Sequence, residues 1–148
     1  MPEVLASAVV PADPDGVWRV VRDFGGIADW HPGIDRIVLE GGAATDQVGA
    51  IRSLGLEDGS TVIELLVGLD DTARALTYEI VESPFPVRLY RSTIRVVPVT
   101  TTGESFVEWS LVFDCDAADA DRLIELFGGG VFTPGLQGLA THFAPGTS

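Results

Sequence analysis

The residues of this 148-residue chain that could do chemistry form no metal-binding or nucleophile motif. His31, His142 and Cys115 stand at no spacing typical of metal ligands. No serine lies in a G-x-S-x-G motif, and the glycine run 128–130 does not follow an expected strand. We therefore expect neither a metal site nor a cofactor, and we expect Cys115 to be a buried structural thiol.

The strongest acid/base candidate is Glu64. A carboxyl group in an apolar cavity has a raised pKa and can accept or release a proton. The alternative is a structural carboxylate paired with an arginine or with turn amides. The phenols of Tyr78 and Tyr90 could polarise a carbonyl or enolate oxygen, or they could be core aromatics with hydrogen-bonded hydroxyls. His31, beside Pro32, could be an acid/base near neutral pH or an exposed loop histidine.

Charge excludes several classes of partner. The chain has 22 acidic and 9 basic residues, a net charge of -13, and all nine basic residues are arginine. Such a chain repels phosphate, so we expect neither nucleic acid nor an anionic membrane as a partner. The absence of lysine excludes a Schiff-base lysine. The length predicts one domain over residues 1–148, and the lack of a signal-like or membrane-spanning segment indicates a cytoplasmic protein.

Helical periodicity is clearest near the end of the chain, from Ala117 to Phe143. Two apolar sets there keep helical spacing but differ in phase by one residue. They comprise Ala120, Leu123, Ile124, Phe127 and Val131, then Phe132, Leu136, Leu139, Ala140 and Phe143. The slip falls on Gly128–Gly130 and Pro134, which are unfavourable inside a helix. We predict one interrupted helix; two helices with a loop are the alternative.

The rest of the chain is predicted to form one strand, two short helices and six further strands. The first strand covers Glu3 to Val10, and Asp13-Pro14 then provides an N-cap with proline at the first helical position. A further turn at 27–30 ends before Pro32. The later strands, separated by turn residues, are expected at Ile34–Leu39, Val48–Leu54, Ser60–Val67, Arg74–Glu82, Arg88–Val97 and Ser105–Asp114.

Alternation along the strands assigns side chains to faces, because every second residue points the same way. It directs Tyr78, Tyr90, Ser92 and Trp109 inward. On the strand Ser60–Val67 two sets compete, and periodicity alone places Glu64 in solvent.

Both the order of elements and local sequence resemble the START/Bet v 1 superfamily over nearly the whole chain. The resemblance is to bacterial polyketide cyclase/dehydrase-type proteins and, more distantly, to plant abscisic acid receptors. It rests on the stretches Val17-Trp18 to Trp30-His31-Pro32, Glu64 to Asp71, Tyr90-Arg91-Ser92 and Trp109 to Asp114. This implies an α+β helix-grip fold, in which a seven-stranded curved antiparallel sheet wraps around the long C-terminal helix.

The resemblance also implies a ligand cavity, left where Gly128–Gly130 thin the helix. In the receptors, the residues matching Glu64, Tyr90 and Ser92 line such a cavity, which reverses the face expected for Glu64 from periodicity. The receptor lysine that meets the hormone carboxylate falls on Gly26, so we expect neutral ligands to be preferred. The other expected ligand contacts are Trp30, Tyr78, Trp109, Phe127, Val131 and Leu136. The expected lid residues are Leu56, Asp58, Phe85 and Pro86, although the receptor gate and latch sequences are not matched.

Three functions remain open. The first is a lyase- or isomerase-type enzyme that cyclises or dehydrates a small, largely apolar, carbonyl-bearing molecule, with Glu64, Tyr78, Tyr90 and His31 as catalytic candidates. The second is a carrier or sensor that binds a hydrophobic ligand without chemistry, and the third is a co-chaperone-like interaction module. The chain is expected to be bacterial and either a monomer or a homodimer; the sequence does not identify the ligand.

Overall fold

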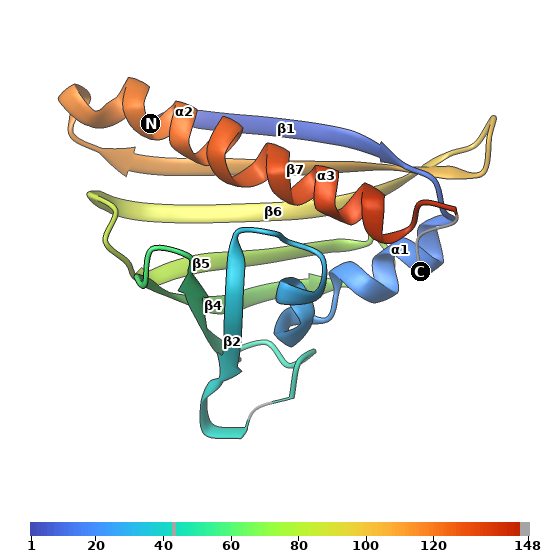
Figure 1. The fold of residues 1–148 in the computed structure, drawn as a ribbon, viewed down its shortest axis with the longest axis horizontal. Coiled ribbons are helices and arrows are strands. Elements are labelled where there is room, and N and C mark those ends of the chain that lie inside the picture. Colours follow the sequence, from blue (N-terminus) through green and yellow to red (C-terminus); the bar gives the residue numbers. More distant parts are fainter. Residues whose placement is uncertain (43, 146–148) are drawn as a thin grey trace.

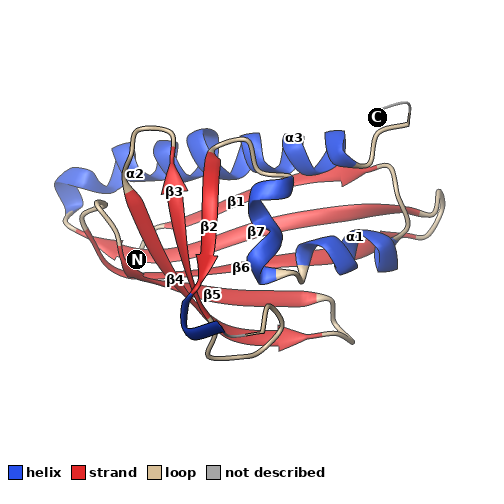
Figure 2. Cartoon of the chain, turned by 60° about the horizontal axis from the view of Figure 1, so that its bottom comes forward, coloured by secondary structure: helices blue, strands red, loops and turns tan. Residues whose placement is uncertain are grey.

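The computed structural model describes residues 1–42 and 44–145; residues 43 and 146–148 of the expected domain lie outside the described part. Seven antiparallel strands form one sheet in the order β1-β7-β6-β5-β4-β3-β2. The sheet is strongly curved, so that β2 and β3 run steeply across the direction of β1, β7 and β6 (Figures 1 and 2). The strands are β1 Glu3–Val10, β2 Ile34–Leu39, β3 Ile51–Leu56, β4 Thr61–Asp70, β5 Ala75–Glu82, β6 Val87–Val99 and β7 Glu104–Cys115. This architecture confirms the expected helix-grip fold.

Most strand boundaries agree with the sequence expectation to within one residue, and β1 and β2 agree at both ends. The expected ends of β3, β4 and β6 fall short of the observed ends at Leu56, Asp70 and Val99. The start of β3 was predicted wrongly, at Val48 instead of Ile51. Gly49 has a φ of 97°, a left-handed conformation that a regular strand does not contain. The amide of Ala50 closes a turn onto the carbonyl of Gln47, although Gly49 and Ala50 already hydrogen-bond to Leu66 of β4. The chain therefore turns at the sheet before the regular strand begins at Ile51.

Two short helices follow β1, as expected. The helix α1, Pro14–Val21, begins at Asp13, whose carboxylate accepts a hydrogen bond from the amide of Gly16 at 3.1 Å. The 3₁₀ helix η1, Phe24–Asp29, leads directly to Trp30 and His31. A shorter 3₁₀ turn, η2, covers Glu40–Gly42 after β2. Together α1 and η1 carry the chain from the end of β1 to the far edge of the sheet.

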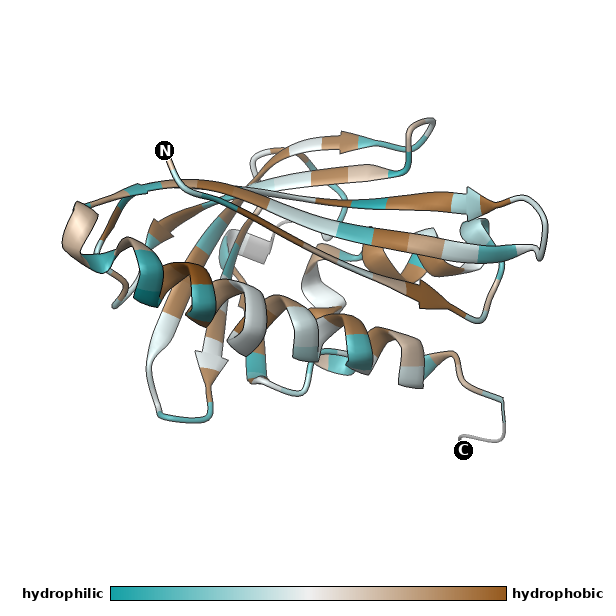
Figure 3. Ribbon diagram, turned by 90° about the horizontal axis from the view of Figure 1, so that it is seen from above, coloured by the Kyte–Doolittle hydropathy of each residue, from teal (hydrophilic) through white to brown (hydrophobic). Residues whose placement is uncertain are grey.

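The C-terminal helix contains no loop but includes one irregular turn. This confirms the prediction, made from the phase slip, of one interrupted helix. A 3₁₀ turn, η3 Ala117–Asp119, leads into α2, Ala120–Phe127. A π-helical turn, η4 Gly128–Phe132, follows, and α3 covers Thr133–His142. A π turn inserts one extra residue into the helical repeat, which accounts for the one-residue change in phase. Figure 3 shows hydrophilic and hydrophobic bands alternating along this helix, and its buried residues include Leu123, Phe127, Leu136 and Leu139.

Two glycines in α3 allow the helix to approach its neighbours closely. A Cβ atom on Gly138 would overlap the carbonyl oxygen of Trp30. A Cβ atom on Gly135 would lie 2.6 Å from Cδ2 of His31 and 2.8 Å from Cζ3 of Trp109. At Gly130 the nearest atom to such a Cβ, Cδ1 of Leu126, is 3.5 Å away, an ordinary contact. The closest approach to neighbouring elements therefore occurs at Gly135 and Gly138, after the glycine run that drew attention in the sequence.

We predict that Gly138→Ala lowers the free energy of unfolding by about 3 kcal/mol or more, because the new methyl group meets backbone atoms that cannot move aside. The matched control is Gly130→Ala, which should stay within about 1 kcal/mol of wild type, because alanine is favoured over glycine in helices by that amount. Urea unfolding of both variants measures the difference. Equal stability of the two variants would contradict the packing described here.

Candidate functional site

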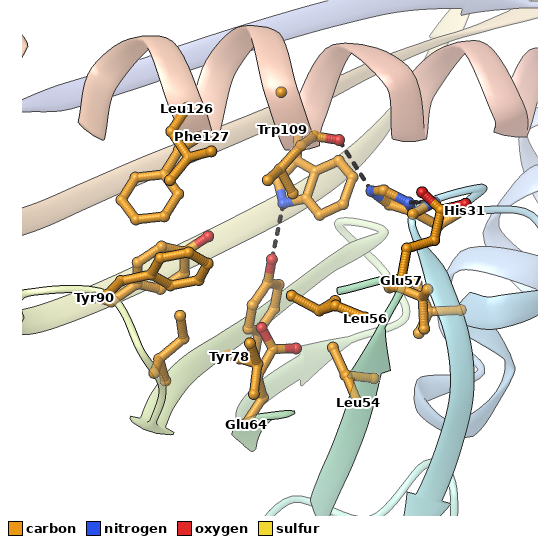
Figure 4. Close-up of a pocket in the computed structure, with 18 of the residues that line it drawn as sticks. His31, Leu54, Leu56, Glu57, Glu64, Tyr78, Tyr90, Trp109, Leu126 and Phe127 are labelled. Carbon is orange, nitrogen blue, oxygen red and sulfur yellow. Dashed lines mark hydrogen bonds between the residues drawn. The ribbon is translucent and has the colours of Figure 1, made fainter. Parts of the chain in front are cut away.

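A cavity of about 320 Å³ lies between the concave face of the sheet and the π turn of the C-terminal helix (Figure 4). This volume is at the lower end of the range for small-molecule sites. The lining is mainly aliphatic and aromatic, with a few polar groups. The lining residues are Ile27, His31, Gly33, Ile34, Leu54, Leu56, Glu57, Asp58, Val62, Glu64, Tyr78, Ile80, Phe85, Tyr90, Trp109, Leu126, Phe127, Gly130 and Val131.

Glu64 points into this cavity, so the solvent position expected from periodicity alone is wrong. Its exposed fraction is 5%, and Val62 and Leu66 are buried on the same face of β4. Burial alternates regularly through these three residues, so Glu64 faces inward without any bulge between them in β4. The register between β4 and β5 is nevertheless irregular, with one shift between Ile63 and Glu64 and another between Leu66 and Gly68. Periodicity failed because the outer face of β4 is apolar and half-buried as well.

The partner of Glu64 is Arg52, which lies opposite it in the pairing of β3 with β4. Arg52 is 2% exposed, and its Nε donates a hydrogen bond to Oε1 of Glu64 at 2.8 Å. Its Nη2 lies 2.7 Å from the same oxygen but makes no hydrogen bond to a described residue, so it contributes charge rather than a second bond. Burial raises the pKa of the Glu64 carboxyl group, and the Arg52 guanidinium opposes this effect without cancelling it.

Tyr78 takes part in a hydrogen-bond network at the inner end of the cavity. The indole Nε1 of Trp109 donates to Oη of Tyr78 at 3.1 Å (Figure 4). It also donates to Oγ of Ser92 at 2.9 Å. Ser92 in turn donates to the carbonyl of Ser110 at 2.9 Å. The Tyr78 oxygen is therefore an acceptor from the indole, and its own O–H is a donor with Ser92, Tyr90 and the cavity around it.

The second tyrosine, Tyr90, packs among aromatic rings. Its ring meets that of Phe127 edge-on at a centroid distance of 5.1 Å, and it lies 6.4 Å from the ring of Tyr78. Burial raises the pKa of both phenols, so both stay neutral and keep their hydroxyl hydrogens. Phe127 also meets Phe85 edge-on at 5.2 Å, which places Phe85 over the cavity beside the helix.

His31 is buried rather than exposed, with an exposed fraction of 4%. The amide of Gly33 donates to its Nδ1 at 3.0 Å, and its Nε2 lies 2.9 Å from the carbonyl of Val131 in the π turn. Because an amide only donates and a carbonyl only accepts, these contacts require the neutral ring with its hydrogen on Nε2. Burial accordingly lowers the pKa of His31. His31 therefore joins the loop before β2 to the helix.

This arrangement predicts a pH dependence of stability. Below about pH 6.5 the unfolded chain binds a proton at residue 31 that the folded protein does not, so the free energy of unfolding should fall as the pH falls from 6.5 towards the lowered pKa of folded His31. His31→Asn removes this contribution, whereas His142→Asn, at the exposed second histidine, retains it. Urea unfolding of the two variants between pH 5.5 and 7 measures how the free energy of unfolding of each depends on pH. The same pH dependence in both variants would contradict this prediction.

The other residues expected at the site divide into two groups. Leu56, Asp58, Phe85, Trp109, Phe127 and Val131 line the cavity. Trp30, Ser92, Leu136 and Pro86 are not among its lining residues. Trp30 packs its ring 5.9 Å from that of Trp109 and borders a separate open groove, while Ser92 and Leu136 are buried in the core.

Arg52 was missed by the sequence analysis, although a usable signal was present. The strands on either side of Asp58 and Gly59 were expected, and pairing them around a three-residue turn, Glu57 to Gly59, places Arg52 opposite Glu64. A basic residue directly across from an inward carboxylate is a favourable cross-strand pair.

The described residues contain neither a metal-binding cluster nor a membrane-spanning helix. No group of three or more histidine, cysteine, aspartate or glutamate side chains there could hold a metal ion. Cys115 is buried, and no helix in this part of the chain is long and apolar enough to cross a membrane.

The sequence of residues 1–144 matches the model of a family described as polyketide cyclase/dehydrase and lipid transport. The chain belongs to this family. A structure of the XoxI protein from Bacillus cereus is similar, with 35% identity, a TM-score of 0.85, and coverage of 97% of this chain and 96% of that one. A solution structure from Thermobifida fusca has 35% identity and a TM-score of 0.88, covering 97% and 93%.

More distant structures share the fold of this polyketide cyclase/dehydrase family member. Norcoclaurine synthase from Thalictrum flavum, solved in complex with dopamine and hydroxybenzaldehyde, is 18% identical with a TM-score of 0.79, covering 99% of this chain and 88% of that one. At this identity the likeness concerns the fold alone. No curated protein matches the chain in sequence.

Proposed function

We propose that the protein binds a compact, largely apolar, carbonyl-bearing molecule in its cavity and moves a proton on it, in a cyclisation or dehydration reaction. The observation that carries this proposal is the pairing of two polar groups in an apolar lining. Oε2 of Glu64 accepts no hydrogen bond from the described residues, and the Tyr78 hydroxyl keeps its hydrogen. One group can accept a proton and the other can donate a hydrogen bond.

The chemistry follows from these roles. A ketone oxygen that accepts the Tyr78 hydrogen bond becomes more electrophilic, and the hydrogens on the neighbouring carbon become more acidic. The Glu64 carboxylate removes one of these hydrogens to give an enol or enolate. That carbon can attack a second carbonyl of the same molecule, and Glu64, now protonated, returns its proton to the alkoxide that forms. In a dehydration, Glu64 then removes the second hydrogen from the same carbon, and this proton leaves with the hydroxyl group as water. The aromatic walls favour reaction by holding a flexible chain folded.

One observation favours the second candidate, a carrier or sensor that binds without chemistry. The Glu64 carboxylate is already paired with Arg52, and both nitrogens of His31 are engaged by backbone groups. Such groups could shape a cavity without moving protons. The two candidates differ in proton transfer, which can be measured without knowing the natural substrate.

The test uses 2-acetylnaphthalene, a two-ring methyl ketone, as a probe. In D₂O, an enzyme that abstracts the proton next to the carbonyl speeds the replacement of the methyl hydrogens by deuterium, which proton NMR detects. Acceleration that saturates with probe concentration supports the enzyme. Saturable binding by calorimetry without any exchange supports the carrier. Native mass spectrometry of freshly purified protein would identify a co-purifying natural ligand.

We predict that neutral ligands bind more tightly than their anions. The charged residues among the described lining are Glu57, Asp58 and Glu64, all acidic, and the chain has a net charge of -13. At pH 7, methyl 2-naphthoate should therefore bind at least about tenfold more tightly than 2-naphthoate, a difference in binding free energy of about 1.4 kcal/mol. Calorimetric titration with the two compounds measures the ratio. Tighter binding of the acid would show that the Arg52 charge reaches the ligand.

A further inference from the structure

Arg52 holds Glu64 in an uncommon way. An arginine and a carboxylate frequently form two parallel bonds that use both carboxylate oxygens. Here Nε and Nη2 both approach Oε1, at 2.8 and 2.7 Å, and Oε2 takes part in neither contact. A pair that served stability alone would be expected to use both oxygens. This pair leaves one oxygen for the cavity that Glu64 lines.

The guanidinium group itself is fixed from three sides. Its central carbon lies 3.9 Å from the centroid of the Phe24 ring and 5.0 Å from that of the Tyr78 ring. Its Nη1 donates a hydrogen bond to the carbonyl of Phe24 at 2.9 Å. A planar group can lie over aromatic rings and bond at its edges, whereas the compact ammonium of lysine cannot reproduce these contacts.

We propose that Arg52 is the positioning residue for Glu64, which it orients with Oε2 towards the cavity and whose protonation it sets through its permanent charge. This inference rests on the proposed role of Glu64. The charged and titratable groups that act on Glu64 come from three strands: Arg52 from β3, Tyr78 from β5 and Tyr90 from β6. Since both tyrosines remain neutral, Arg52 provides the nearby charge. It is not among the cavity-lining residues, so it acts through Glu64.

The first experiment follows the titration of Glu64 and requires no substrate. Protein labelled with ¹³C at the glutamate carboxyl carbon is titrated by NMR, and the Glu64 signal is assigned by its loss in Glu64→Gln. In Arg52→Met the midpoint should rise by about 1 to 3 pH units, because an opposite charge at this distance is removed while burial remains. The control, Arg91→Met, removes an exposed arginine near Glu79 and should leave the midpoint unchanged. An unchanged midpoint in Arg52→Met, or an equal rise in both variants, overturns the proposal.

The second experiment separates orientation from charge. Arg52→Lys retains the charge, so the Glu64 midpoint should stay near that of wild type, while deuterium exchange into 2-acetylnaphthalene falls by about 10²-fold because Oε2 no longer faces the methyl carbon. A wild-type exchange rate in this variant overturns the positioning role. Wild-type protein also provides a readout if a variant does not fold: the ketone should shift the Glu64 carboxyl signal and leave the Arg52 Nε–H signal in place. Displacement of the Nε–H signal overturns the proposal. Because the titration is independent of turnover, an inactive protein would contradict the proposed function alone.

Discussion

Glu64→Gln is expected to lower the rate of deuterium exchange into 2-acetylnaphthalene, and turnover of any substrate the wild type converts, by about 10² to 10⁴. The amide has nearly the shape of the carboxyl group and can still accept the hydrogen bond from Nε of Arg52. It cannot take up a proton from carbon. Affinity for the ketone should change by about 1 kcal/mol or less, because the Tyr78 hydroxyl and the apolar walls remain. A loss in rate with little loss in binding is the signature of a proton-transfer residue.

The matched control is Glu57→Gln, which removes another cavity-lining carboxylate. Glu57 is exposed, and its variant should retain the wild-type exchange rate. Unchanged exchange in Glu64→Gln would remove Glu64 from the mechanism and leave the tyrosines and His31 to be considered. If the wild type binds the ketone but causes no exchange, the carrier function is favoured instead.

Glu64→Leu is expected to have the largest effect on stability, a loss of about 3 to 5 kcal/mol. The substitution leaves the Arg52 guanidinium buried without its carboxylate, and arginine cannot become neutral by losing a proton. The double variant Arg52→Met/Glu64→Leu replaces both charges with apolar groups and should recover most of the loss. Urea unfolding of the two single variants and the double variant gives the interaction energy of the pair.

An exposed ion pair provides the comparison. Arg95 and Glu108 lie 3.9 Å apart on the outer face of the sheet, and Glu108→Leu should change stability by less than about 1 kcal/mol. If Glu64→Leu lowers the free energy of unfolding no more than this surface variant does, the Arg52–Glu64 pair is accessible to water in solution. That result would contradict the description of a buried ion pair.

The fold was predictable because its strongest signals are local. The phase slip at Gly128–Gly130 predicted an interrupted helix, and the π turn occupies Gly128–Phe132. Proline after a capping aspartate predicted the start of α1, and alternation correctly buried Tyr78, Tyr90 and Trp109. Each of these patterns depends on residues within a few positions of one another.

The site was less predictable because it depends on contacts between distant segments. Periodicity cannot distinguish two faces that are both partly buried, so the orientation of Glu64 came from the family resemblance alone. The hydrogen bond between His31 and the carbonyl of Val131 depends on the meeting of the β2 loop with the helix 100 residues later. Likewise, Gly135 and Gly138 are identified as contact points only when the helix is placed against Trp30, His31 and Trp109.

The most direct test of the central claim is a crystal structure of the protein with 2-acetylnaphthalene bound. The ketone oxygen should lie about 3 Å from Oη of Tyr78, with the methyl carbon facing Oε2 of Glu64 and the rings among Tyr90, Phe85 and Phe127. Arg52 should remain on Oε1. A ketone that lies in the groove between Trp30 and His142, or that fills the cavity with its carbonyl turned away from Tyr78, would contradict the account.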